Sequence, residues 1–148
     1  MTDAQLFAVA NAVPLLGWLA LLFAPLRRGP LIAAARVVAV VLAVAYLVLI
    51  AGRLGSAPGS LDLASFSTLD GLARAFDQPA VMLVGWVHYL AFDLWVGAWE
   101  AEEAHRRGVP HWMLIPCLAL TFLAGPVGLL LFLLARAVFG RHRRSIAA

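Results

Sequence analysis

The stretch AVMLVGWVHYLAFDLWVGAW, from Ala80 to Trp99, is 20 residues long and almost entirely apolar. An α-helix of about 20 residues is long enough to cross a hydrocarbon core of about 30 Å. In lipid, the backbone N–H and C=O groups must be bonded within the segment, so the stretch is predicted to be helical. The sequence therefore predicts an integral membrane protein.

The rest of the chain has the same character. Hydrophobic residues make up 64% of the 148 residues and charged residues 13%, against about 45–50% and about 25% in soluble domains. A soluble domain of this size cannot bury so much apolar surface. Three more stretches, 6–24, 31–52 and 112–135, have spanning length. We expect an all-α bundle of four transmembrane helices, forming one domain over residues 1–140 with a basic tail at 141–148.

The links between the spans differ in kind. PLRRGP, at residues 25–30, predicts a tight turn and an antiparallel first pair of helices. EAEEAHRRG, at residues 100–108, is interpreted as an exposed charged loop that joins the last two spans. Residues 53–60 (RLGSAPGS) predict a flexible loop. FSTLDGLARAF, at residues 66–76, predicts a short amphipathic helix on the membrane surface, with Ser67 and Asp70 as a capping box; an irregular loop is the alternative.

All basic residues are arginines, which lie singly or in pairs near the ends of the apolar stretches. Such positions favour contact with lipid headgroups, and no nucleic-acid partner is expected. Four spans would put both termini on one side, and the positive-inside rule then favours cytoplasmic termini by a small margin. The N-terminus has neither a signal-peptide nor a transit-peptide pattern. We expect a multi-pass protein of a bacterial inner membrane.

Ionisable side chains within a span are costly and indicate a functional site. Residues 80–99 contain His88 and Asp93, and Glu100 follows directly. At about 100° per residue, two stripes result. One carries His88, Phe92, Trp95 and Trp99; the other, about 140° away, carries Trp86, Tyr89, Asp93 and Glu100. We expect both stripes to face protein or a cavity rather than lipid.

These residue types suit acid–base chemistry next to an apolar ligand, because a buried carboxyl group can exchange protons near neutral pH. The predicted catalytic residues are Asp93, His88, Glu100 and Tyr89. The predicted ligand-binding residues are Trp86, Phe92, Trp95, Trp99, Thr121 and Phe122. The alternative is structural: interhelical hydrogen bonds for Asp93 and His88, and interface aromatics for the tryptophans.

Residues 112–135 contain Pro126, which frees the carbonyl of Phe122 and predicts a kinked helix forming the wall of a cavity. Thr121 lies one turn before Gly125 and could bond a freed backbone group. Asn11 and Pro14 suggest a polar contact and a second kink in the first span. No metal or cofactor is predicted. A metal or haem site is the alternative, with candidate ligands His88, Asp93, Glu100, Glu103, His105 and His111.

Three segments, GWVHYLAFDLWVGAWE (85–100), GVPH (108–111) and PCLALTFLAGPVGLLL (116–131), resemble the abscisic-acid-deficient-four-like membrane family. NAVPLLGW (11–18) and residues 66–76 agree more loosely. The plant member of that family is required to make neoxanthin from violaxanthin, an isomerisation that opens an epoxide and forms an allene. The resemblance implies a base for a carbon-bound proton and an acid near the epoxide oxygen, for which Asp93, His88, Glu100 and Tyr89 are suitable residue types.

Three functions remain open from the sequence. The first is a membrane enzyme, or enzyme component, that isomerises a carotenoid-like isoprenoid lipid. The second is a non-catalytic protein that binds a carotenoid or lipid, and the third is an assembly subunit of a membrane complex. The expected partners are membrane lipid and a hydrophobic small molecule, and protein partners are not predicted.

Overall fold

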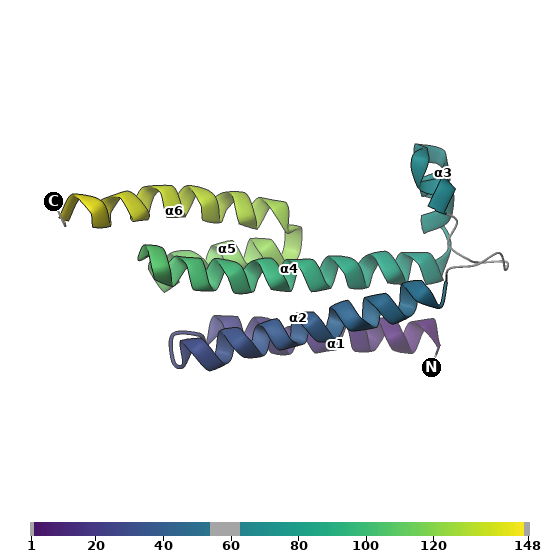
Figure 1. Ribbon diagram of the computed structural model, residues 1–148, viewed down its shortest axis with the longest axis horizontal. Coiled ribbons are helices and arrows are strands. Elements are labelled where there is room, and N and C mark those ends of the chain that lie inside the picture. The colour runs from purple at the N-terminus through teal and green to yellow at the C-terminus, as the bar shows by residue number, and fades with distance from the viewer. Residues whose placement is uncertain (1, 54–62, 147–148) are drawn as a thin grey trace.

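The computed structural model describes residues 2–53 and 63–146, and every regular element within these ranges is helical. Helices α1 (Asp3–Leu22), α2 (Arg28–Ala51) and α4 (Pro79–Arg107) are long and apolar enough to cross a membrane. They run along the long axis of the molecule (Figure 1). The predicted all-helical fold is confirmed, and three of the four expected spans are present as helices of spanning length.

The first two helices form the expected antiparallel pair (Figure 1). Thr2 and Gln5 start α1 with a capping box, in which each side chain accepts the other residue's backbone N–H. Helix α1 continues through Pro14 to Leu22. Helix α2 starts at Arg28, and Pro30 fits within its first turn, where the missing N–H has no intrahelical partner to lose.

A short 3₁₀ helix, η1 (Leu63–Ser67), and α3 (Leu69–Phe76) precede α4 and stand at one end of the bundle (Figure 1). The predicted short helix is present, but the predicted cap is wrong. The hydroxyl of Ser67 donates to the carbonyl of Ala64 at 2.7 Å, and Thr68 caps α3 by accepting the N–H of Gly71 at 3.1 Å. Apart from Arg53, the loop expected at 53–60 lies outside the described residues.

Helix α4 is longer than expected. Its 29 residues rise about 43 Å, roughly 13 Å more than a bilayer core. The interpretation of residues 100–108 as an exposed loop is wrong, because the helix continues to Arg107 and the connection is only residues 108–110. Alanine and glutamate are good helix formers, and Glu103 pairs with Arg106 and Arg107 on the next turn.

The expected fourth span, 112–135, is not one helix. It is divided into α5 (His111–Ala124) and α6 (Pro126–Ile146), which fold back on each other as an antiparallel hairpin (Figure 1). Gly125 has φ 21° and ψ −82°, a conformation that L side chains rarely adopt. Proline disfavours helical backbone in the residue before it, so the chain turns here instead of kinking. Helix α6 includes most of the expected tail.

The two arms of the hairpin approach closely at Gly128. A Cβ atom on Gly128 would lie 2.1 Å from the backbone nitrogen of Thr121, so only glycine fits. Because α6 runs back along α5, the start of α1 and the end of α6 lie at opposite ends of the molecule (Figure 1). The expectation that both termini share one side is therefore wrong.

Gly128→Ala should weaken the hairpin, because the added methyl group meets backbone rather than a movable side chain. We expect the free energy of unfolding to fall by about 1–3 kcal/mol or more, which would lower the thermal unfolding midpoint in detergent micelles. Gly29→Ala is the matched control, since a Cβ atom there meets nothing within 4 Å. Equal unfolding midpoints for both variants would contradict the hairpin packing.

Candidate functional site

Four side chains of α4 form a polar seam that faces α1 and the α5–α6 hairpin. The seam consists of Trp86, Tyr89, Asp93 and Glu100, which follow one another at spacings of three, four and seven residues. These spacings return to the same face of an α-helix. The contacts described below confirm that this predicted stripe is turned toward protein.

Glu100, the last residue of the seam, contacts Thr121 of α5, and both residues are fully buried. The hydroxyl of Thr121 lies 3.0 Å and 3.1 Å from the two carboxyl oxygens of Glu100. A hydroxyl carries one hydrogen, so it donates to one of these oxygens at a time. The contact joins α4 to α5 through a hydrogen bond shielded from lipid and water.

Asp93 lies against the turn between α5 and α6. A Cβ atom on Gly125 would be 2.6 Å from Oδ1 of Asp93, so glycine is needed here for space as well as for backbone conformation. The hydroxyl of Tyr89 lies next to both the Asp93 carboxyl and the backbone of Gly125. Oδ2 of Asp93 is buried and has no hydrogen-bond partner within the described chain. The seam therefore contains one carboxyl oxygen whose bonding capacity is unused.

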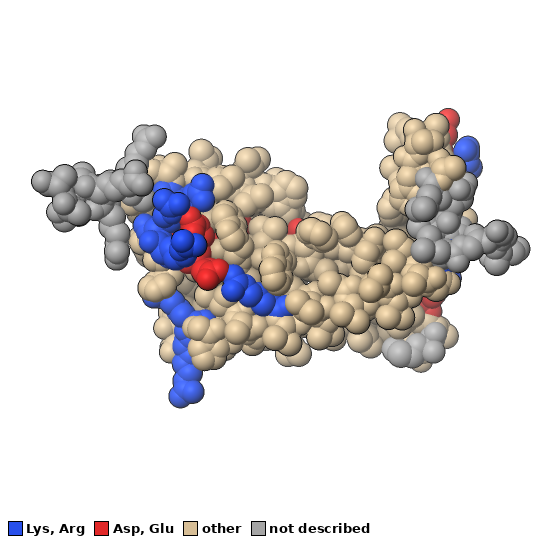
Figure 2. Space-filling view, in the orientation of Figure 1, with Lys and Arg blue, Asp and Glu red and all other residues tan. Residues whose placement is uncertain are grey.

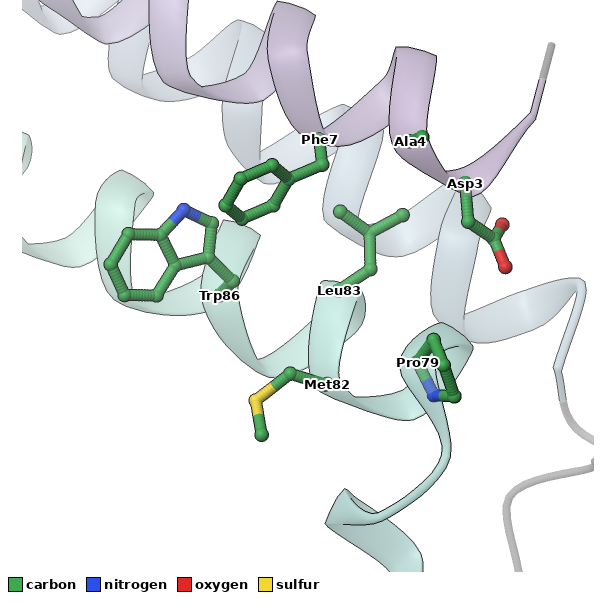
Figure 3. A pocket seen from close by; sticks show the side chains of 7 residues that line it. All are labelled: Asp3, Ala4, Phe7, Pro79, Met82, Leu83 and Trp86. Atoms are coloured by element: carbon green, nitrogen blue, oxygen red, sulfur yellow. The ribbon is translucent and has the colours of Figure 1, made fainter.

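A cavity of about 380 Å³ lies between α1 and α4 near the start of both helices. In Figure 3, the rings of Phe7 and Trp86 face each other at one end of this cavity, while Asp3 and Pro79 lie at the other. Trp86 also stacks on Tyr89, with ring centroids 5.5 Å apart. The same indole thus lines the cavity and contacts the polar seam.

Asn11 fixes the position of Trp86. Nε1 of Trp86 donates to Oδ1 of Asn11 at 3.1 Å, and the Asn11 amide nitrogen donates to the carbonyl of Phe7 at 2.7 Å. The polar contact predicted for Asn11 is present. The N–H of an indole usually finds an acceptor when buried, and here that acceptor holds the ring at the inner end of the cavity.

His88 lies on another face of α4, toward α2. Its ring centroid is 5.2 Å from that of Tyr46 and 4.7 Å from that of Phe92. His88 lines a groove of about 310 Å³, and Phe92 and Trp95 line a second groove of about 270 Å³ farther along the same two helices. The structure therefore does not bring His88 together with Asp93 and Tyr89.

The remaining predicted ligand-binding residues lie elsewhere. Trp99 packs edge-on against Phe132 of α6, at 5.5 Å, and the guanidinium of Arg136 lies over its ring. Phe122 contacts Trp18 in an apolar groove between α1 and α5. The predicted aromatic set is therefore divided among several surfaces and does not enclose one ligand.

No three His, Cys, Asp or Glu side chains gather into a metal-binding group within residues 2–53 and 63–146 as described. His111 and His105 have other contacts: Nε2 of His111 lies 2.9 Å from the carbonyl of Leu22, and Nδ1 of His105 lies 2.7 Å from Arg28. Glu103 is surrounded by three arginines. These candidate ligands from the sequence are thus placed apart.

The sequence interpretation missed two features: the turn at Gly125 that packs against Asp93, and the cavity lined by Phe7. The signal for the first was present, because a Gly-Pro pair marks turns more strongly than kinks. The cavity has no signal in a single sequence, since it depends on how α1 and α4 pack.

Long apolar helices, a broken helix and a half-buried carboxyl group facing the break define a helical membrane protein with an internal polar site. Residues 5–132 match the family described as ABA DEFICIENT 4-like. The chain belongs to this family, as its resemblance indicated. Comparison with curated proteins and with solved structures found no match.

Thr121→Val should destabilise the protein by about 1–3 kcal/mol, because Glu100 loses its donor while remaining buried. Thermal unfolding in detergent measures this change, and Thr121→Ser, which keeps the hydroxyl, should restore most of the stability. In a Glu100→Met background, Thr121→Val should cost much less. An equal cost in both backgrounds would show that the hydroxyl does not act through Glu100.

Proposed function

We propose that the protein acts on a carotenoid-like isoprenoid lipid within the membrane, by acid–base isomerisation at Asp93. The observation that carries the proposal is the buried, unpartnered Oδ2 of Asp93 beside a broken helix. Leaving such an atom unbonded costs about 1–3 kcal/mol. An ionisable group kept inside a membrane at that cost is a functional-site hypothesis by default.

The cavity between α1 and α4 favours a long apolar substrate over a compact one. Pro79, which lines the cavity at the start of α4, and Asp93 are 14 residues apart on α4, which is about 21 Å along the helix axis. Trp86 lies between them and contacts both the cavity and Tyr89. A rod-shaped polyene along α4 would place one end group near the seam and leave its chain against Phe7 and Met82.

The Tyr89–Asp93 pair suits an isomerisation without a redox cofactor. Opening an epoxide to form an allene and a hydroxyl removes one proton from carbon, breaks one C–O bond and adds one proton to oxygen. In this scheme Asp93 takes the carbon-bound proton and Tyr89 gives its proton to the oxygen. Because the two groups are adjacent, Asp93 then returns a proton to Tyr89. Glu100 takes no step in this scheme, because its carboxyl group is fully buried and bonded to Thr121.

Asp93→Asn should lower conversion of a carotenoid epoxide by about 10²–10⁴-fold, because the amide cannot take the proton. Conversion is measured by chromatography of pigments from membranes containing the protein and violaxanthin, the substrate that the family resemblance suggests. Tyr89→Phe should also lose activity. The matched control is Asp70→Asn on the exposed face of α3. Full conversion by a correctly folded Asp93→Asn variant would exclude acid–base catalysis at this residue.

A second candidate function is binding of a carotenoid or lipid without conversion, in the groove between α2 and α4. It is favoured by the aromatic stripe of His88, Phe92 and Trp95, which lines two neighbouring hollows.

If this groove holds pigment, Phe92→Ala should reduce the polyene absorption that copurifies with the protein, while Asp93→Asn should leave it unchanged. Phe122→Ala, in the groove beside α1, is the matched control. Equal pigment in all variants would place the pigment outside the α2–α4 groove.

A further inference from the structure

The two ends of the bundle differ sharply in charge. Figure 2 shows most of the blue and red side chains of the visible face gathered at one end, a few at the other, and very few along the middle. That end comprises the α1–α2 turn, the last turns of α4 and the middle of α6. Its described charged residues are Arg27, Arg28, Arg36, Arg106, Arg107, Arg136, Glu102, Glu103 and the buried Glu100.

The hairpin creates this concentration of arginines. Arg136 lies 3.4 Å from Glu103 because α6 runs back toward the end of α4. A continuous fourth span would have carried Arg136 to the opposite end of the molecule. The sequence adds Arg141, Arg143 and Arg144 to the last turns of α6, beyond Arg136 in the same direction.

The glutamates neutralise only part of this charge. Glu102 pairs with Arg36, whose guanidinium also lies over the ring of Trp95. Glu103 is shared by Arg106, Arg107 and Arg136. Arg27 and Arg28 are exposed. The described part of this end has six arginines and three glutamates, and Glu100 is buried against Thr121 and pairs with none of the arginines within the described residues.

The opposite end has the reverse balance. Its described charged residues are Arg53, Arg74, Asp3, Asp70 and Asp77, and Arg53 pairs with Asp3 at 3.0 Å. An apolar bundle separates this mildly acidic end from the basic one. An excess of arginine on one side of the spans determines which side stays in the cytoplasm.

We infer that the arginine-rich end binds the anionic lipid headgroups of the cytoplasmic leaflet, which places the end of α6 in the cytoplasm and the start of α1 outside. Exposed arginines near the surface attract anionic headgroups, and their guanidinium groups bond phosphate oxygens at two points. The α1–α4 cavity then lies in the outer half of the membrane, because Asp3 and Pro79, at the starts of α1 and α4, line it.

Single cysteines test the orientation in a bacterial host. Gly29→Cys marks the basic end, where an added Cβ atom meets nothing, and Asp70→Cys marks the other end. We expect a membrane-impermeant maleimide to label Asp70→Cys in intact spheroplasts, and Gly29→Cys only in inside-out vesicles. The buried Cys117 of the unmodified protein gives the background. The opposite pattern, or labelling of both positions from both sides, would overturn the proposal.

Two further measurements complete the test. A green fluorescent protein of the kind that does not fold after export should fluoresce when it is fused after residue 148. A dark fusion would also overturn the proposal. In mild detergent, native mass spectrometry should show the Arg27→Gln, Arg28→Gln double variant binding phosphatidylglycerol about thirtyfold more weakly. Arg53→Gln with Arg74→Gln is the matched control. Equal losses in both double variants would refute headgroup binding at the basic end.

Discussion

In hydrocarbon, a break in a helix leaves backbone groups without partners, and each such group costs several kcal/mol if nothing else bonds it. This protein places a break at Gly125, directly against Asp93 and Tyr89 of α4. The polar side chains and the broken backbone therefore occupy the same protected region. The position of α6 and the environment of the candidate site both depend on this contact.

The three long helices provide the frame that keeps this region closed. Without a hydrophobic driving force between helices in lipid, association depends on close packing and interhelical hydrogen bonds. Gly17 and Gly97 leave room for the side chains of Leu94 and Trp18 from the facing helix. Nε1 of Trp86 bonds Asn11 across the same α1–α4 interface. The seam is thus held between α1 on one side and the hairpin on the other.

Much of this arrangement follows from local rules. Length and hydropathy predicted three of the spans, and a helical wheel correctly grouped Trp86, Tyr89, Asp93 and Glu100 on one face. The rules failed where a distant partner decides the outcome. The charged sequence of residues 100–107 predicts a solvated loop when it is considered alone. In the structure Glu102 pairs with Arg36 of α2 and Glu103 with Arg136 of α6, and the segment is helical.

The same reasoning explains the error at the fourth span. A proline within a long apolar run usually kinks a helix, and its neighbours can satisfy the freed backbone. The Gly125-Pro126 pair allows a turn, and α6 can then fold back on α5 because Gly128 lets it pack against Thr121, a contact that no single-helix pattern contains. Likewise, helical periodicity predicted that His88 and Asp93 lie on different faces of α4. It could not predict that His88 contacts Tyr46 of α2 and that Asp93 contacts Gly125 of the hairpin.

One local feature therefore has two distant consequences. With a continuous fourth helix, Asp93 would face regular backbone whose groups are already bonded, and Arg136 would join Arg53 and Arg74 at the other end. With the turn at Gly125 and Pro126, the carboxyl group meets an interrupted helix and the arginines collect at one end. The candidate site and the charge asymmetry of the bundle thus share a structural origin, although each is open to an independent test.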